Sequence, residues 1–258
     1  PNGTNYTIEN IFDDVEVPWS IEFINEETII YAEKKGEIFM INEGKSTKID
    51  NVPEVYFRGQ GGLLDLELHP DFQENKFIYI SYASGSKDLG GGNTAVSRAK
   101  LINNKLVDIE LLYKGEENST KGQHFGTRLQ FDKNGKLFFA IGDRGNRDKL
   151  PQDISLDGGK IYRINDDGSI PNDNPFINEE NAKKAIFSYG HRNPQGIFLH
   201  PKTGEIWTNE HGPKGGDEIN IISKGKNYGW PKITYGINYS GTTITDEKEH
   251  PKMEQPLY

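Results

Sequence analysis

The chain has 258 residues, a net charge of −9 with an isoelectric point near 5.3, and 33% hydrophobic residues. This length suffices for one large domain with a hydrophobic core, and the acidic charge excludes the basic surface that nucleic-acid binding needs. The absence of cysteine excludes disulfide bonds, zinc–thiolate sites and cysteine nucleophiles, and no run of about 18 apolar residues predicts a membrane span.

Short alternating strands joined by turns recur along the chain, and its 29 glycines and 13 prolines are typical of a turn-rich, all-β protein. Similar hairpin units start near residues 18, 61, 126 and 194. A spacing of roughly 40 to 70 residues, with about four strands per unit, predicts the blades of a β-propeller. A β-sandwich or β-barrel is the alternative. The sequence predicts no helix beyond one turn at Asn181–Phe187.

The last segment, Pro231–Tyr258, is polar and rich in turns, and we interpret it as a connection towards another blade. We therefore expect one β-propeller domain over residues 1–258, with about four blades present and the C-terminal blades missing. The chain begins at Pro1 without methionine or an apolar leader, so we expect a processed or excised sequence whose export signal is not visible.

Three glycine-rich turns carry candidate functional residues. The first, KGQHFGTRL, places His124 just before the first strand of the third unit, where a histidine could accept a proton near neutral pH. The second, GHRNPQG, holds Arg192 and Asn193 ahead of Pro194, which stiffens the turn and suits an arginine that grips a carbonyl or carboxylate. A surface-loop histidine and a structural turn with a solvated arginine are the alternatives.

The third turn, EHGPKGGDE, offers the backbone carbonyls of Gly212 and Pro213 with Asp217 close behind, and such oxygen ligands suit calcium. The segment NDDGSIPNDNP lacks the glutamate that would complete a calcium loop, so we interpret it as a turn rich in Asx residues. The histidines of HPDF and HPKTG are interpreted as turn-stabilising, and GDRGNRD as a solvated loop that could line a cleft. No HExxH, GxGxxG or GxSxG motif is present.

Taken together, seven motifs in register resemble the glucose/sorbosone dehydrogenase family, the soluble quinoprotein sugar dehydrogenases. The motifs are GQGGLLDLELHPDF, HFGTRL, IGDRG, GGKIYRINDDGSIPNDNPF, GHRNPQG, EHGPKGGDEIN and GKNYGWP. The resemblance covers nearly all of Pro18–Pro231 and implies a six-bladed propeller that uses pyrroloquinoline quinone (PQQ) and calcium. It also implies a periplasmic or secreted protein with an external electron acceptor.

The resemblance implies a role for each candidate residue. His124 matches the general base, which takes the proton from the anomeric hydroxyl of an aldose while hydride passes to C5 of the quinone. Gln60 matches a glutamine on the substrate side, Arg192 an arginine near the reacting quinone carbonyl, and Asn193 a quinone contact. Calcium is held in the family by the carbonyls that match Gly212 and Pro213, with Asp217 in its water shell. The expected reaction is oxidation of an aldose to its lactone.

One departure from the family pattern concerns the base. Gln123 stands where the glucose-type enzymes carry an aspartate, so we expect no carboxylate to orient His124. The EHGPKGGDE turn resembles the broad-specificity aldose branch. The lysine and arginines that clamp PQQ in the family belong to blades that we expect beyond Tyr258.

Two other functions remain open. A calcium-dependent propeller lactonase would place several acidic side chains on the propeller axis, and a non-catalytic propeller binding module would lose the base. We expect His124, Arg192 and Asn193 on the axis instead, which favours the dehydrogenase.

Overall fold

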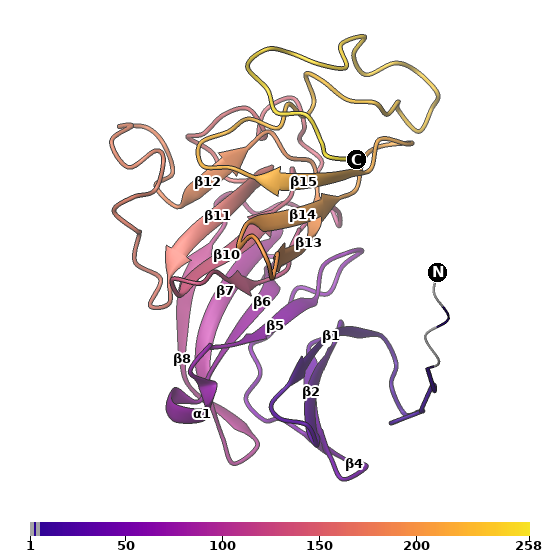
Figure 1. The fold of residues 1–258 in the computed structure, drawn as a ribbon, viewed down its shortest axis with the longest axis vertical. Helices are drawn as coiled ribbons and strands as arrows, with labels where there is room; N and C mark the ends of the chain where they lie inside the picture. The colour runs from indigo at the N-terminus through magenta and orange to yellow at the C-terminus, as the bar shows by residue number, and fades with distance from the viewer. Residues whose placement is uncertain (1–2, 4–5) are drawn as a thin grey trace.

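Four antiparallel β-sheets follow one another in an arc (Figure 1), in a computed structural model that describes residue 3 and residues 6–258. In each sheet, strands that follow one another in the chain lie side by side, which is the arrangement of propeller blades. The arc is open between the first and fourth sheets (Figure 1). The prediction of an all-β propeller with about four blades is confirmed, and the prediction of further blades beyond Tyr258 stays a prediction.

The first two blades each contain four strands in the order of the chain. The strands of the first blade are β1 (Pro18–Phe23), β2 (Thr28–Glu33), β3 (Glu37–Asn42) and β4 (Lys45–Lys48). Those of the second blade are β5 (Leu63–Leu68), β6 (Phe77–Ser86), β7 (Gly91–Ile102) and β8 (Lys105–Lys114).

The third blade has four strands and the fourth has three. The strands of the third blade are β9 (Gln130–Phe131), β10 (Lys136–Ile141), β11 (Lys160–Asn165) and β12 (Ile186–Tyr189). Those of the fourth blade are β13 (Pro194–Leu199), β14 (Ile206–Glu210) and β15 (Glu218–Ile222). The predicted starts at residues 18, 61, 126 and 194 therefore lie at, or within a few residues of, the first residue of each blade's first strand.

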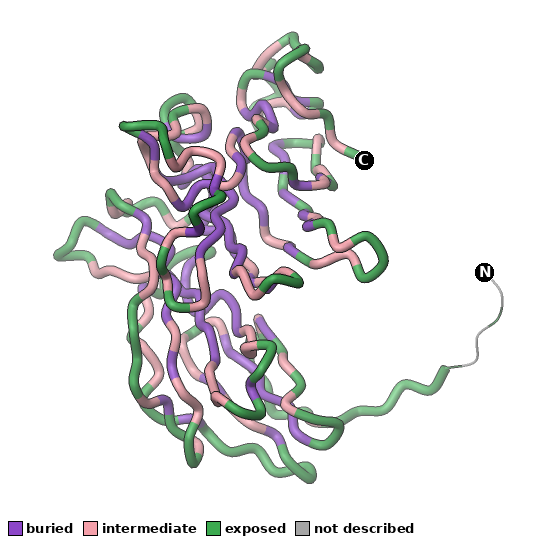
Figure 2. Tube along the Cα trace, turned by 60° about the vertical axis from the view of Figure 1, so that its left-hand side comes forward, coloured by how far each residue is buried: buried purple, intermediate pink, exposed green. Residues whose placement is uncertain are grey.

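The hydrophobic core lies between neighbouring blades, because successive side chains of a strand point to opposite faces of its sheet. Strand β10 shows the rule. Leu137 and Phe139 pack towards the second blade with Tyr79, whereas Phe138 and Ala140 pack towards the fourth. Figure 2 shows this burial as continuous runs along the strands, with exposed residues at the turns. Strands that are apolar on both faces are thereby buried within the stack of blades.

Over residue 3 and residues 6–258, helical structure is confined to one turn, which lies elsewhere than predicted. Among the described residues the helix is α1 (Phe72–Asn75), directly after the HPDF turn. The expected turn at Asn181–Phe187 is wrong, because Ile186 begins β12 and that strand pairs with β11. The apolar residues of β12 gain more from burial against the sheet than a short isolated helix could provide.

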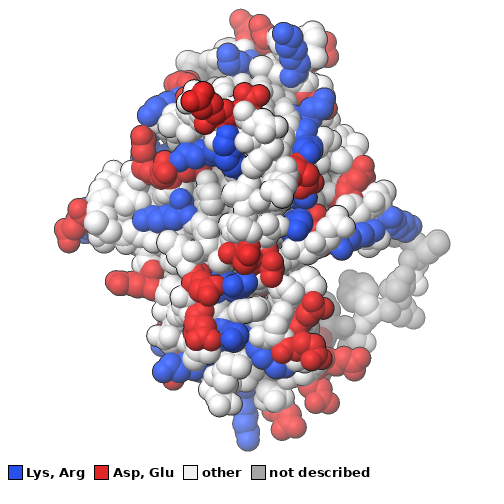
Figure 3. Space-filling model, turned by 90° about the vertical axis from the view of Figure 1, so that its left-hand side faces the viewer, with Lys and Arg blue, Asp and Glu red and all other residues white. Residues whose placement is uncertain are grey.

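The surface carries both signs of charge. On the face shown in Figure 3, lysine and arginine side chains are interspersed with aspartate and glutamate side chains. In the part of the chain that the structure describes, no helix has the length and apolarity needed to cross a membrane.

Candidate functional site

All seven predicted site residues line one cavity of about 290 Å³. They reach it from turns at one end of the blades: the turn before β5, the turn before β9, the turn before β13 and the turn after β14. The lining residues are Gln60, His124, Arg192, Asn193, His211, Gly212, Pro213, Asp217 and Tyr239. Residues separated by more than 150 positions in the sequence therefore meet as expected.

His124 is buried, at 9% exposure, and its ring is oriented by a carboxylate. Its Nδ1 lies 2.6 Å from Oδ1 of Asp143, and its backbone N–H donates to Oε1 of Gln60 at 2.6 Å. The expectation that no carboxylate orients His124 is wrong, since Asp143 supplies it from a different turn. The backbone of His124 has a φ of 54°, a left-handed conformation that is uncommon for a non-glycine residue and recurs at functional sites.

Asp143 is held as an anion by three donors. Oδ1 accepts from His124 Nδ1 and from the backbone N–H of Gly145 at 2.7 Å, and Oδ2 accepts from Nε1 of Trp230 at 2.8 Å. Burial by itself would raise the pKa of Asp143, but the hydrogen bonds and the charge of His124 outweigh it and lower that pKa below its ordinary value. An ionised carboxylate only accepts hydrogen bonds, so the neutral form of the imidazole carries its proton on Nδ1 and has its lone pair on Nε2.

The first half of the GDRGNRD segment is buried, in contrast to the solvated loop that the sequence indicated, whereas Asn146 and Asp148 are exposed. Asp143 and Arg144 are 1% and 2% exposed. The guanidinium of Arg144 lies 3.4 Å from the ring centroid of Phe125 and donates to the carbonyls of Gly92 and Lys121. Burial lowers the pKa of Arg144 to about 10, which still leaves it charged at neutral pH. This arginine fixes the loop from which Asp143 reaches His124.

Arg192 and Asn193 are also buried, and neither is a solvated turn residue. Arg192 donates from Nη1 to the carbonyl of His211 at 2.7 Å, and its guanidinium lies 5.5 Å from the ring centroid of Trp230. Oδ1 of Asn193 accepts from the backbone N–H of Gly126 at 3.1 Å. Nδ2 of Asn193 is buried without a hydrogen-bond partner among the described residues. A donor of this kind next to a cavity is available to a ligand.

The EHGPKGGDE turn presents oxygen atoms to the same cavity. Gly212 donates its backbone N–H to Oδ1 of Asp217 at 2.8 Å, and a Cβ at Gly212 would lie 2.1 Å from the carbonyl oxygen of Gly216, so only glycine fits. Over residues 6–258, the carbonyls of Gly212 and Pro213 accept no hydrogen bond. The described residues contain no group of three or more His, Cys, Asp or Glu side chains that could hold a metal ion. Any cation here would depend on backbone carbonyls and Asp217.

A second cavity of about 470 Å³ adjoins the first and shares His124, Arg192, Pro213 and Tyr239 with it. Its further walls come from Asp143, Trp230 and polar side chains of two loops. One contact joins these loops, because Nη1 of Arg147 donates to Oδ1 of Asn238 at 2.7 Å. The two cavities together give His124 access to a polar space large enough for a small hydrophilic molecule.

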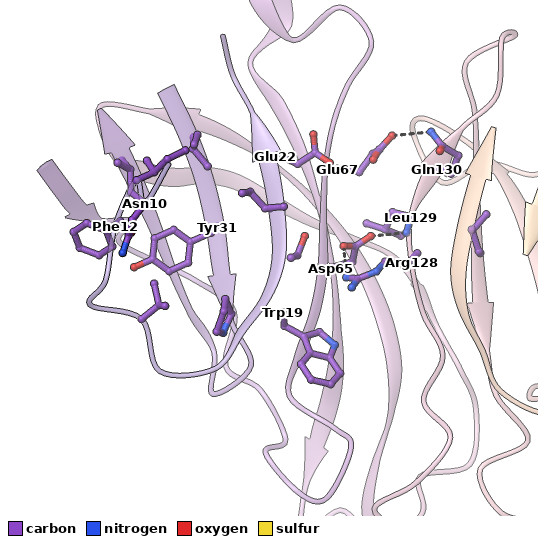
Figure 4. A pocket seen from close by; sticks show the side chains of 18 of the residues that line it. Asn10, Phe12, Trp19, Glu22, Tyr31, Asp65, Glu67, Arg128, Leu129 and Gln130 are labelled. Carbon is purple, nitrogen blue, oxygen red and sulfur yellow. Dashed lines mark hydrogen bonds and ion pairs between the residues drawn. The ribbon is translucent and has the colours of Figure 1, made fainter. Parts of the chain in front are cut away.

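A larger cavity of about 680 Å³ lies among the first strands of the blades (Figure 4). Its carboxylates are Glu22, Asp65 and Glu67, and Asp65 pairs with Arg128 at 2.8 Å. Burial, and then the charge of Asp65, raises the pKa of Glu22 to about 7. Burial, and then the charges of Glu22 and Asp65, raises the pKa of Glu67 to about 9. We place the functional site in the smaller cavities, because they hold a base, two buried donors and free carbonyls.

The remaining motifs behave as the sequence indicated. The backbone N–H of Ser169 donates to Oδ1 of Asp167 at 2.9 Å, which is the Asx turn expected in NDDGSIPNDNP. Nδ1 of His69 accepts from the backbone N–H of Asp71 at 2.9 Å, and Nδ1 of His200 accepts from that of Thr203 at 3.2 Å. Both histidines stabilise their turns.

Comparison with known proteins gives one family for this chain. The profile of the Glucose / Sorbosone dehydrogenase family matches residues 15–258. The aldose sugar dehydrogenase YliI of Escherichia coli (strain K12) is 42% identical over 258 aligned residues, which cover 97% of this chain and 69% of that protein. The quinoprotein glucose dehydrogenase B of Acinetobacter calcoaceticus is 36% identical over 229 residues, which cover 77% of this chain and 46% of that protein.

Among solved structures, the PQQ-bound form of aldose sugar dehydrogenase from Streptomyces coelicolor is similar in fold. The TM-score is 0.81 at 25% sequence identity, and the match covers 98% of this chain and 70% of that one.

Proposed function

The chain belongs to the glucose/sorbosone dehydrogenase family, and from this premise we propose that it is a quinoprotein dehydrogenase that oxidises aldose sugars to lactones. The observation that carries the proposal is the Asp143–His124 pair, which opens into the cavity that also holds Arg192 and Asn193. A base beside buried hydrogen-bond donors is the equipment that removal of a hydroxyl proton and a hydride requires.

In this proposal His124 is the general base. Its Nε2 takes the proton of the anomeric hydroxyl, and the Asp143 carboxylate stabilises the imidazolium that forms. Gln60 uses Oε1 to hold the backbone of His124, which leaves its amide N–H groups for a sugar hydroxyl. Arg192 provides positive charge on the side of the cavity where negative charge develops.

The residues present fit PQQ and calcium. The unpartnered Nδ2 of Asn193 and the guanidinium of Arg192 would hold the oxygens of PQQ, and the carbonyls of Gly212 and Pro213 would hold calcium with Asp217. When bound, PQQ supplies the hydride acceptor and calcium supplies Lewis-acid polarisation. The name of one relative, a quinoprotein glucose dehydrogenase, supports the quinone cofactor. The proposal also includes an external electron acceptor and a periplasmic or secreted location, which the family resemblance implies.

The alternatives are less well supported. The carboxylates of the 680 Å³ cavity are what a calcium-dependent lactonase would need, but Asp65 is already paired with Arg128. A non-catalytic binding module would have no need for the buried Asp143–His124 pair.

A dye-coupled assay tests the proposal. The protein is incubated with PQQ and calcium, and reduction of an artificial electron acceptor is followed with several aldoses and with a lactone as a hydrolysis control. The proposal predicts sugar-dependent dye reduction that requires PQQ. Absence of reduction with every aldose, together with hydrolysis of the lactone, would replace the dehydrogenase with the lactonase.

A further inference from the structure

A single buried carboxylate lies behind the turn that carries Arg192 and Asn193. Glu210 is the last residue of β14, and its side chain is 4% exposed. Its Oε2 accepts from the backbone N–H of Arg192 at 2.6 Å and of Asn193 at 3.3 Å. Its Oε1 lies 2.9 Å from Nδ1 of His191 and accepts from Nδ2 of Asn220 at 3.2 Å. One side chain therefore contacts three consecutive residues of the turn.

Only a carboxylate satisfies this set of partners. The two backbone groups and the amide of Asn220 are donors, and His191 must carry its proton on Nδ1 to bond an oxygen that only accepts. Nε2 of His191 then accepts from the hydroxyl of Ser188 at 2.9 Å. A glutamine at this position would turn an NH₂ group towards two donors, whichever way its amide points. The four contacts thus depend on the two acceptor oxygens of the Glu210 side chain.

The turn before β13 needs an acceptor from elsewhere in the protein, because its backbone N–H groups have no partner in the sheet. Strand β13 begins at Pro194, so the N–H groups of Arg192 and Asn193 lie outside its ladder of hydrogen bonds. Buried backbone donors without a partner are costly, and Glu210 removes that cost. The residue after Glu210 joins the same unit, because His211 donates its N–H to the carbonyl of Asn193 at 3.3 Å and accepts from Arg192 Nη1.

We propose that Glu210 is a positioning residue, which fixes the backbone of Arg192 and Asn193 so that their side chains face the cofactor. The proposal rests on the proposed function. Glu210 lines a neighbouring cavity of about 720 Å³ together with His211 and Asp217, but neither of the two cavities around His124. It therefore acts on those cavities through the turn. Glu210 is also the last residue of β14, which leads into Gly212 and Pro213. It thereby connects Arg192 and Asn193, which we propose hold PQQ, to the carbonyls that we propose hold calcium.

Glu218 provides a neighbouring control. It lies opposite Glu210 in the register of β14 and β15, and its Oε2 accepts from Nδ2 of Asn220 at 3.0 Å. Its carboxylate makes no hydrogen bond to residues 191–193 among the described contacts. Burial, and then the charge of Glu210, raises the pKa of Glu218 to about 8, so the side chain is largely protonated at neutral pH. Glu218→Gln therefore controls for the amide substitution beside Asn220 without touching the turn and with little change of charge.

The experiment compares Glu210→Gln and Glu218→Gln with the wild type in the full 258-residue chain. Hydrogen exchange of the backbone amides of residues 191–193 is measured in the apoprotein, and the Kd for PQQ is measured by titration at saturating calcium. We expect Glu210→Gln to speed exchange at Arg192 and Asn193 selectively and to raise the Kd at least tenfold. Glu218→Gln should change neither measurement.

The outcomes separate the two proposals. Unchanged exchange and an unchanged PQQ Kd in Glu210→Gln would overturn the role of Glu210, as would equal effects in the two variants. A wild-type protein that bound no PQQ would overturn the proposed function instead, whatever the exchange of the turn. Should Glu210→Gln give no folded protein, Glu210→Asp, which keeps the charge but withdraws the carboxylate by one methylene, is measured in the same way and must show the same selective loss.

Discussion

Replacement of Asp143 by asparagine tests the orientation of the base. The two carboxylate oxygens of Asp143 accept three N–H groups: Oδ1 those of His124 and Gly145, and Oδ2 that of Trp230. An asparagine offers one acceptor oxygen and one NH₂ group. In either orientation of its amide, Asp143→Asn therefore turns a donor towards a donor.

The size of the effect depends on which side meets the NH₂ group. If it faces His124, the imidazole proton moves to Nε2 and no lone pair remains for the sugar, a change that costs about 10⁴ in kcat in the Ser–His–Asp template. If the NH₂ group faces Trp230, His124 keeps its tautomer but loses the negative charge that stabilises the imidazolium. Impaired general base catalysis of this kind is expected to lower kcat about 10²-fold. We expect kcat to fall between these limits, a barrier increase of about 3–5 kcal/mol.

The assay is dye-coupled turnover at saturating PQQ and calcium, with the Kd for PQQ measured in parallel. Asp148→Asn is the control, because Asp148 lies in the same loop and lines the same cavity but its side chain is 88% exposed. A loss below about tenfold in Asp143→Asn, or an equal loss in Asp148→Asn, would refute the assignment of Asp143 as the group that orients His124.

Three further predictions concern the rest of the molecule. Trp230→Phe removes one donor to Asp143 and should lower kcat about tenfold with PQQ affinity retained, as kinetics and titration would show. The pKa of Glu67 is raised from 4.5 to about 9, so folding takes up a proton between these values and stability falls as pH rises through that window. Glu67→Gln should flatten this fall, by up to about 1.4 kcal/mol per pH unit in urea denaturation at pH 5 to 9, and an unchanged slope would contradict it. Chelation of calcium should release PQQ. Asp217→Asn should raise the calcium concentration at which PQQ binding is restored, whereas Asp173→Asn in the Asx-rich segment should leave that concentration unchanged.

The blades were predictable because their signal is local. Alternation of apolar and polar residues and glycine-rich turns can be recognised within each hairpin, so the starts at residues 18, 61, 126 and 194 agree with the sheets. Strand β12 was missed because Ile186–Tyr189 spans four residues after a long polar turn. Its conformation depends on pairing with β11, which the local sequence does not contain.

The positions of the site residues were predictable from their motifs, but their partners were not. Asp143 follows β10 and His124 precedes β9. Antiparallel pairing brings the end of β10 and the start of β9 to the same end of the sheet. That geometry could have predicted the pair, had the two strands been assigned. Glu210 stayed unnoticed for a similar reason, since its four donors converge from two other segments of the fourth blade. The carboxylates of Asp65 and Glu67 in the 680 Å³ cavity could have been predicted to lie close together, because residues two apart in a strand share a face.

The most direct test of the dehydrogenase proposal is a spectrum of PQQ bound to the protein, recorded without any external acceptor before and after addition of an aldose. The account predicts that the oxidised quinone absorbance disappears in a single turnover in the wild type, and that His124→Ala binds PQQ but slows this change by about 10²–10⁴. Bound PQQ whose spectrum no aldose alters would contradict the account, and so would reduction at the wild-type rate in His124→Ala.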